Sequence, residues 1–336
     1  MNSHGSTNST PRKVLVTGGS GFVGGHLVER LIERGDEVTV FDTAPPPGPL
    51  ASENAKYVRG DIRDETELAR VIRSNVDVIY HLAAVVGVDR YLSDPTAVID
   101  TNFSGTRNVL DLATRAGAKV VLASTSEVFG KNSSVPWRED SDRVLGPSSA
   151  ARWSYATGKA LAEHLAFSYR DQHGLELTVV RYFNAYGPGQ RPAYLVSRSV
   201  HRALNGRAPV IYDGGGQTRC FTFVQDVVEG TVLAGTRTDV AGESFNIGSG
   251  TETTIARAVR LIGELTGANT EPLDVDTGSV LGDSYEDLPR RVPDSTKARQ
   301  MLGWSERTSL REGLRRTIEW ARASPWWLAL PEGGAG

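Results

Sequence analysis

The sequence predicts an α/β fold, in which a doubly wound parallel sheet carries a smaller C-terminal α/β lobe. Two observations support this fold class. Short apolar runs with the length of a strand alternate with longer helical stretches through the first half of the chain. After about residue 182 this rhythm ends, and Gly, Pro and Asp become frequent between scattered helices and short strands. Strands buried on both faces of a sheet read as continuous Val, Ile and Leu runs, and their alternation with helices requires right-handed crossovers between parallel strands.

The elements of the first half follow one another as strand and helix. Apolar runs predict strands at 13–17, 37–42, 56–59, 76–82, 119–124 and 175–182. The segments between them carry the longer period of helices, which we expect at 22–34, 65–74, 94–116 and 153–173. We therefore place the sheet domain at 12–182, with a helix near 227–235 and a strand near 244–247 returning to it. Residues 183–325 are expected to form most of the second lobe, and 1–11 and 326–336 are expected to be tails.

Composition excludes several classes of protein. The formal net charge is −3 and no run is rich in Lys and Arg, so there is no footprint for nucleic acid. The longest apolar stretches have the length of a strand rather than of a membrane span. Cys220 is the only cysteine, so an internal disulfide is impossible and a cytoplasmic protein is expected. No Cys and His cluster has the spacing of metal ligands, and we expect no metal.

A glycine-rich turn directly follows the first strand and opens the first helix. Residues 18–24 read Gly-Gly-Ser-Gly-Phe-Val-Gly, which allows a tight turn, a close approach of backbone N–H groups to a pyrophosphate, and close packing of helix on strand. The helix N-terminus adds a favourable partial charge for phosphates. In this context the motif predicts a Rossmann-type dinucleotide site that includes Gly18, Gly21, Phe22, Val23 and Gly24.

Two aspartates end the second and third strands. A carboxylate at Asp42 can accept hydrogen bonds from both hydroxyls of the adenosine ribose and would repel a 2′-phosphate. Thr43 and Ala44 follow it with no Arg, so NAD is favoured over NADP. Asp61, followed by Ile62, stands where its carboxylate either caps the adenine amine or only stabilises a turn.

Tyr155 and Lys159 lie four residues apart in a predicted helix and therefore share one face. A free tyrosine has a pKa near ~10 and is a poor base at neutral pH. A neighbouring ammonium and a positive nicotinamide ring would favour the phenolate, which makes Tyr155 a candidate base for a sugar hydroxyl. Residues 124–127, Ser-Thr-Ser-Glu, follow a parallel strand at the edge where ligands bind in open α/β sheets.

Together these motifs resemble the extended short-chain dehydrogenase/reductase family of NAD-dependent nucleotide-sugar epimerases and dehydratases. The resemblance covers nearly the whole chain, and its other marks are His81-Leu82-Ala83-Ala84 and the segments 181–188, 214–226 and 297–304. It implies NAD as cofactor and assigns Leu82, Ala83, Ala84, Tyr155, Lys159 and Tyr182 to the cofactor site.

The resemblance also implies oxidation of a nucleotide-sugar at C4. Thr125 would hydrogen-bond the C4 oxygen, Tyr155 would remove its proton, and NAD⁺ would take the hydride. Lys159 would hold the nicotinamide ribose and lower the pKa of Tyr155. The same comparison assigns substrate binding to Asn184, Arg219, Tyr285 and Arg291, and Arg suits this role because its planar fork makes bidentate contacts with phosphate or carboxylate.

Oxidation at C4 is compatible with three products, namely those of a 4-epimerase, a dehydratase and a uronate decarboxylase. Glu127 is informative here, because simple epimerisation needs no further acid beside Thr125. The Thr-Ser-Glu sequence resembles both the uronate decarboxylases and the GDP-mannose dehydratases. Residues 285–294 resemble the decarboxylases, in which Ser126, Glu127 and Arg291 would fall on catalytic positions. The Asp-Glu pair of dTDP-glucose dehydratases is not matched, since Ser126 replaces the aspartate.

The preferred interpretation is decarboxylation of UDP-glucuronate to a UDP-pentose. A nucleotide-sugar 4-epimerase and a dehydratase are the alternatives, and an NAD-binding sensor or scaffold is the alternative outside the enzymes. The family also suggests a homodimer formed by the helices at 94–116 and 153–173, although these helices could equally cover the sheet without a partner.

Overall fold

The computed structural model describes residues 11–46, 48, 51–268, 271–276, 278 and 288–333. Its centre is a seven-stranded sheet with the strand order β11-β6-β5-β4-β1-β2-β3, and every pair in it is parallel. The strands are β1 (Lys13–Thr17), β2 (Glu37–Asp42), β3 (Lys56–Arg59), β4 (Val78–His81), β5 (Lys119–Thr125), β6 (Leu177–Tyr182) and β11 (Ser244–Ile247). The parallel sheet confirms the expected fold class.

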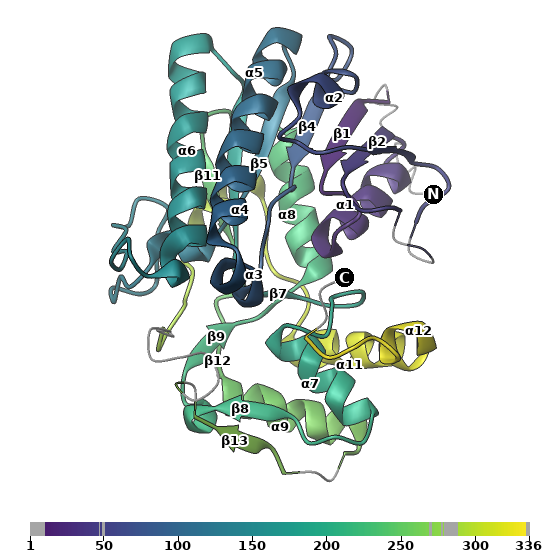
Figure 1. Ribbon diagram of the computed structural model, residues 1–336, viewed down its shortest axis with the longest axis vertical. Helices are drawn as coiled ribbons and strands as arrows, with labels where there is room; N and C mark the ends of the chain where they lie inside the picture. The colour runs from purple at the N-terminus through teal and green to yellow at the C-terminus, as the bar shows by residue number, and fades with distance from the viewer. Residues whose placement is uncertain are drawn as a thin grey trace, which may run out of the picture.

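Helices cover both faces of this sheet (Figure 1). They are α1 (Phe22–Glu33), α2 (Glu65–Ala69), α3 (Val88–Ser93), α4 (Pro95–Asp100), α5 (Thr106–Ala116), α6 (Ser154–His173) and α8 (Val224–Thr236). Successive residues of a strand point to opposite faces, so Val14 and Val16 pack with α1 and α8, whereas Leu15 packs on the side of α5 and α6. The two cores hold the carboxyl ends of the strands in fixed register.

After β6 the chain enters a second lobe, which Figure 1 shows beneath the sheet. Its elements are β7 (Ala185–Tyr186), α7 (Leu195–Leu204), β8 (Val210–Tyr212), β9 (Thr218–Cys220), β10 (Thr222–Phe223), β12 (Glu252–Thr254), α9 (Ile255–Thr266), β13 (Leu273–Val275), α11 (Leu310–Arg322) and α12 (Pro325–Leu328). Between these elements, α8 and β11 return to the sheet, at the places where a helix and a strand were expected.

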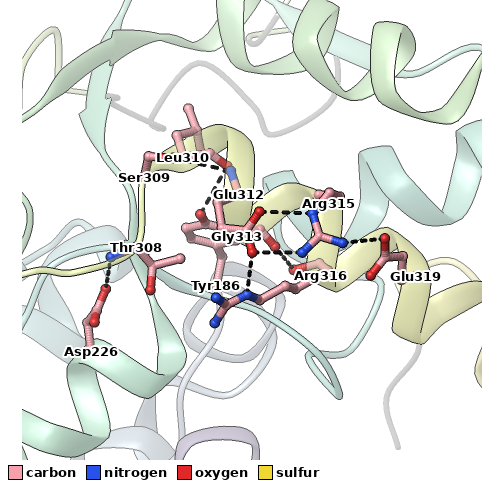
Figure 2. A network of polar contacts seen from close by, with 11 residues as sticks. Tyr186, Asp226, Thr308, Ser309, Leu310, Glu312, Gly313, Arg315, Arg316 and Glu319 are labelled. Carbon is pink, nitrogen blue, oxygen red and sulfur yellow. Dashed lines mark hydrogen bonds and ion pairs between the residues drawn. The ribbon is translucent and has the colours of Figure 1, made fainter.

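A polar network fastens α11 to the rest of the molecule (Figure 2). The Ser309 hydroxyl accepts a hydrogen bond from Glu312 N at 3.3 Å and so caps the helix. Glu312 pairs with Arg315 and Arg316 one turn later. Just before the helix, Thr308 N donates to an Asp226 carboxylate oxygen at 3.0 Å in the first turn of α8. The second lobe is thereby tied to a helix of the sheet domain.

Four segments differ from the expected elements. The helix expected at 65–74 ends after Ala69, and α3 was not expected. The helix expected at 94–116 begins as expected, with Asp94 capping a helix that starts at Pro95, but a π-helical turn at Thr101–Gly105 divides it into α4 and α5. The tail expected at 326–336 contains part of α12, and Trp327 packs in the core of the second lobe with 1% of its surface exposed.

Within the described part of the chain, no helix combines the length and the apolar composition that crossing a membrane requires. The described residues also contain no group of three or more His, Cys, Asp or Glu side chains arranged to hold a metal ion.

Candidate active site

A cavity of about 1360 Å³ extends along the carboxyl ends of the sheet strands and into the second lobe. All the described residues that the sequence assigned to the site line it: Gly18, Gly21, Phe22, Val23, Gly24, Asp42, Asp61, Ile62, Leu82, Ala83, Ala84, Thr125, Ser126, Glu127, Tyr155, Lys159, Tyr182, Asn184, Arg219 and Arg291. Tyr285 lies outside the described residues. Residues that lie far apart in the chain therefore border one space.

The glycine turn has the shape that a dinucleotide pyrophosphate needs. Gly18 has a φ of +75°, and a Cβ there would lie 2.6 Å from Ala83 N, so only glycine fits. A Cβ at Gly24 would collide with the carbonyl oxygen of Gly18. The Ser20 hydroxyl oxygen is buried and has no hydrogen-bond partner among the described residues, so it is left for a ligand. These observations fit a phosphate seated on the N-terminus of α1.

Asp42 is fixed by backbone groups at the end of β2. Its carboxylate accepts hydrogen bonds from Ser20 N and from Ala44 N, each at 3.0 Å. The side chain is therefore oriented beside the glycine turn before any ligand binds, as recognition of a ribose requires.

Asp42→Asn is expected to weaken NAD binding and to reduce the preference for NAD over NADP, each by about tenfold, because a charge-assisted hydrogen bond and a repulsive charge are both lost. Titration calorimetry with the two cofactors checks this. Asp77→Asn is a matched control, since Asp77 accepts a hydrogen bond from Lys13 N at 2.7 Å and does not line the cavity. Unchanged selectivity in Asp42→Asn would contradict the assignment.

Asp61 is held in a turn at the end of β3. Its carboxylate accepts hydrogen bonds from Arg63 N at 2.9 Å and from the Arg63 guanidinium at 2.7 Å. The hydrogen bond from the Arg63 side chain lowers the pKa of Asp61. These contacts fit the interpretation in which Asp61 stabilises a turn. Asp61 also lines the cavity beside Ile62, so the interpretation in which it contacts an adenine stays open.

Tyr155 and Lys159 face the cavity from the first two turns of α6. The Lys159 ammonium donates to the Ala123 carbonyl oxygen at 3.0 Å, and burial lowers its pKa to about 8. Burial raises the pKa of Tyr155, the negative charge of Glu127 and the nearby Tyr194 add to this effect, and a hydrogen bond with Thr125 opposes it. The direction is opposite to the one expected from Lys159, so the protein side chains alone keep Tyr155 protonated. A positive nicotinamide ring is the remaining source of a lower pKa.

The Glu127 carboxylate forms ion pairs with two arginines beside Thr125. One carboxylate oxygen accepts a hydrogen bond from Arg152 Nη2 at 2.8 Å, and the other accepts one from Arg291 Nη1. Burial opposes ionisation of this carboxyl, but the two guanidinium charges outweigh it and lower the pKa of Glu127 to about 2. Glu127 is therefore a carboxylate at neutral pH, and two cations line the cavity beside it.

The structure brings Asn184 and Arg219 to the far side of the cavity. Asn184 has a φ of +39°, a strained conformation for a residue other than glycine, and Thr222 N donates to its carbonyl oxygen at 3.2 Å. Arg219 is 7% exposed and donates to the carbonyl oxygens of Thr218 and Leu288 at 2.7 and 2.8 Å. Its guanidinium is oriented by the backbone next to the ligand space.

Several cavity-lining residues were not identified from the sequence. Arg152 was noted only as part of the motif before Tyr155. Its ion pair with Glu127 joins two 3₁₀ turns, Ala151–Trp153 and Ser126–Phe129, that are distant in the sequence. The segment 188–194 borders the cavity after the Tyr-Gly-Pro-Gly turn, which signals a loop but not its position. Trp326, Trp327 and Leu330 also line it, although they lie in the segment expected to be a tail.

His81, beneath the cofactor end of the cavity, makes stability depend on pH. Burial lowers its pKa from 6.5 to about 3, with a contribution from the charge of Lys159. Its Nδ1 and Nε2 atoms lie 2.7 and 3.0 Å from the hydroxyls of Thr17 and Thr106. Below about pH 6.5 the unfolded chain binds a proton at His81 that the folded chain does not, so stability falls with falling pH.

We therefore expect the free energy of unfolding to decrease from about pH 6.5 downward, by up to ~1.4 kcal/mol per pH unit for this one proton. Glu127 adds to the decrease below about pH 4.5, because its folded-state pKa is lower than its usual value. Urea unfolding at a series of pH values measures the slope. His173→Gln, at an exposed position, should leave the slope unchanged, whereas a flat profile between about pH 6.5 and 5 in the wild type would contradict the prediction.

Comparisons with known proteins identify the family of this chain. Residues 14–248 match the model of the family described as "NAD dependent epimerase/dehydratase family". UDP-N-acetyl-alpha-D-glucosaminuronate decarboxylase of Bacillus cytotoxicus is 39% identical over 93% of this chain and 98% of its own length. UDP-glucuronic acid decarboxylase 1 of Xenopus tropicalis is 35% identical over 93% of this chain and 72% of its own.

Two solved structures show the same fold. UDP-glucose 4-epimerase of Thermotoga maritima with UDP-glucose has a TM-score of 0.85 at 32% identity, over 93% of this chain and 99% of that one. MoeE5 in complex with UDP-glucuronic acid and NAD has a TM-score of 0.82 at 33% identity, with the same two coverages. This chain is accordingly an NAD-dependent enzyme of nucleotide-sugars, and it belongs to the NAD dependent epimerase/dehydratase family.

Proposed function

We propose that this enzyme decarboxylates a UDP-linked hexuronate through transient oxidation at C4. The observation that carries the proposal is the pair of cations, Arg152 and Arg291, held around Glu127 next to Thr125 and Tyr155. An epimerase of a neutral sugar such as UDP-glucose has no carboxylate to stabilise at this end of the cavity, whereas a C6 carboxylate is stabilised by a guanidinium within reach. The named decarboxylase relatives, one acting on an N-acetylated and one on a hydroxylated uronate, support the same reaction class.

The chemistry follows from what each side chain can do. Thr125 and Tyr155 would hold the C4 hydroxyl, and Tyr155 would take its proton as the alcohol becomes a ketone. A bound NAD supplies the hydride acceptor at C4 and the hydride donor at the end. The oxidised sugar is a β-keto acid, so the bond between C5 and the carboxyl group breaks readily, CO₂ leaves, and the electron pair stays on the sugar as an enolate. Arg291 would orient the substrate carboxylate. Glu127, which is ionised, would orient the water that delivers a solvent proton to C5, and Tyr155 would return its own proton to the C4 oxygen when the ketone is reduced again.

Mass spectrometry tests the reaction directly. The purified protein with NAD⁺ is incubated separately with UDP-glucuronate, UDP-N-acetylglucosaminuronate, UDP-glucose and dTDP-glucose. Loss of CO₂ from either uronate supports the proposal. The uronate that is decarboxylated faster shows which group the enzyme accepts at C2 of the sugar. Unchanged uronates would contradict it. A new isomer of UDP-glucose would then favour the 4-epimerase, which the similarity to the Thermotoga maritima enzyme makes the second candidate, and loss of water would favour a dehydratase.

We further propose that the protein forms a homodimer in the cytoplasm. Leu92, Ile99 and Leu161 on α3, α4 and α6 are 36%, 46% and 45% exposed, and α4 packs against α6. A second copy seated on these helices would cover the three side chains. Light scattering coupled to size-exclusion chromatography measures the mass, and a monomer at micromolar concentration would contradict this assignment. The free thiol of Cys220, which is buried, is compatible with a reducing compartment.

A further inference from the structure

The C-terminal segment, defined here as residues 325–333, forms part of the wall of the large cavity. It begins with α12, which Figure 1 shows next to α11. Trp326, Trp327 and Leu330 of this segment line the cavity. Trp327 is 1% exposed, whereas Trp326 is 40% exposed. The rings of both lie edge-on to Trp320 of α11, at centroid distances of 5.6 and 5.9 Å.

The C-terminal segment is fastened to α7. The Leu328 carbonyl oxygen accepts hydrogen bonds from His201 Nε2 at 3.0 Å and from Asn205 Nδ2 at 3.2 Å. Arg202 donates to both carboxylate oxygens of Glu332, at 2.5 and 2.7 Å. His201 also lies edge-on to the Trp327 ring, with the centroids 5.2 Å apart. Charged, polar and aromatic contacts thus fix the segment at both of its ends.

The same segment holds the loop at 188–194, which we call the pocket loop. Trp327 Nε1 donates to the Gln190 carbonyl oxygen at 2.9 Å in a buried environment, and Gly333 N donates to the Pro192 carbonyl oxygen at 3.2 Å. On its other side the pocket loop is bound by the sheet domain, because His26 Nε2 of α1 lies 2.8 Å from the Pro188 carbonyl oxygen. The pocket loop is therefore hydrogen-bonded to α1 on one side and to the C-terminal segment on the other.

The pocket loop faces the reacting end of the cavity. Gln190, Arg191 and Tyr194 line the cavity. The Gln190 side chain is 5% exposed and donates to the Ala185 carbonyl oxygen at 2.9 Å, while its Oε1 has no hydrogen-bond partner among the described residues. A buried acceptor of this kind is suited to a donor on a ligand. Tyr194 is close enough to Tyr155 to influence the ionisation of that phenol.

We propose that the C-terminal segment is a functional part of the nucleotide-sugar site, and that Trp327 is a positioning residue which fixes the pocket loop for substrate binding. Trp327 acts through the main chain of Gln190 rather than by reacting. The inference rests on the proposed function for its choice of ligand, a UDP-sugar. It adds a determinant of affinity that comes from the last residues of the chain.

Trp327→Phe is the informative variant, because it keeps an aromatic ring in the core and removes the Nε1–H donor to Gln190. Loss of one buried hydrogen bond that holds a binding loop is expected to raise KM for the nucleotide-sugar, and the Kd for UDP measured by calorimetry, by about fivefold to tenfold. The kcat value and the NAD affinity should stay close to those of the wild type. Glu332→Gln weakens the anchor to Arg202 at a more exposed position and should change KM in the same direction by a smaller factor.

Trp320→Phe is the matched control, since Trp320 belongs to the same aromatic cluster but does not line the cavity. Its UDP affinity should equal that of the wild type. The inference is overturned if Trp327→Phe binds UDP as tightly as the wild type. It is also overturned if Trp327→Phe and Trp320→Phe both lose UDP affinity, NAD affinity and melting temperature to a similar extent. UDP binding tests this inference independently of the reaction. If the wild type binds UDP but decarboxylates no uronate, the proposed function is wrong. The UDP affinity of Trp327→Phe would still show whether the C-terminal segment contributes to binding.

Discussion

Replacing Tyr155 by Phe should lower kcat by about 10²–10⁴-fold, the usual contribution of a positioned acid or base. The buried phenol is held by Thr125 and lies within the influence of Glu127 and Tyr194, and in the proposed reaction its hydroxyl would carry the proton of the sugar hydroxyl that is oxidised. The ring itself packs among Tyr91 and Val98, and Phe preserves this packing. Steady-state kinetics and NAD binding should therefore show a loss of turnover without a matching loss of cofactor.

Tyr186→Phe is the control for the loss of a buried tyrosine hydroxyl. The hydroxyl of Tyr186 donates to the Leu310 carbonyl oxygen at 3.3 Å in the network of Figure 2, away from the cavity. Its turnover should remain near the wild-type value. Retained turnover in Tyr155→Phe would remove the catalytic assignment and would favour a protein that binds NAD without performing the reaction.

Replacing Glu127 by Gln should separate oxidation from product formation. The amide keeps a hydrogen-bond acceptor for one guanidinium but removes the charge that Arg152 and Arg291 share, so the carboxylate and the protonation at C5 are no longer controlled. We expect formation of the UDP-pentose to fall by about 10²-fold or more, while reduced nicotinamide still appears on addition of the uronate. Absorbance of the reduced cofactor and mass spectrometry of the sugar measure the two steps separately.

The same variant should also be less stable. Arg152 and Arg291 have 2% and 9% of their side-chain surface exposed, and removing the charge between them leaves two buried cations, which typically costs about 3–5 kcal/mol. Glu252→Gln offers a control, because Glu252 pairs with Arg290 next to Arg291 but does not line the large cavity. Equal rates of product formation in Glu127→Gln and Glu252→Gln would show that Glu127 has no part in the reaction.

The sheet was predictable from the sequence because its strands are buried on both faces. Runs such as the one at 119–124 admit few other structures. The rule of right-handed crossovers restricts the order of the strands but does not fix it, and the order was not predicted. The short strands of the second lobe were not predictable, because pairs such as β7 with β10 have two residues each and depend on contacts between distant segments. The start of α4 was signalled by Asp94 and Pro95, whereas the π-helical turn that separates α4 from α5 has no comparable signal.

The site was predictable where local motifs carry it, as in the glycine turn and at Asp42, Tyr155 and Lys159. It was not predictable where a side chain reaches the site only through contacts between segments that are distant in the sequence. Arg152 becomes part of the site only because the 3₁₀ turn at Ala151–Trp153 brings it to Glu127, and Trp327 only because the C-terminal segment turns back onto the pocket loop. The electrostatic state of Tyr155 was also not predictable, since it depends on the sum of burial and of charges from distant segments.

The return of β11 to the edge of the sheet has a consequence for how the protein is made. Ser244 pairs with Val179 only after the chain has passed through α7 and the strands β7 to β10 of the second lobe. The nascent sheet therefore presents the free edge of β6 until residue 247 has left the ribosome, and an exposed strand edge is a template for aggregation. Pairing across such a separation also makes folding slow relative to that of a locally connected domain. The two lobes are expected to form as one cooperative unit, and cutting the gene after β6 should yield an insoluble product rather than an isolated dinucleotide-binding domain.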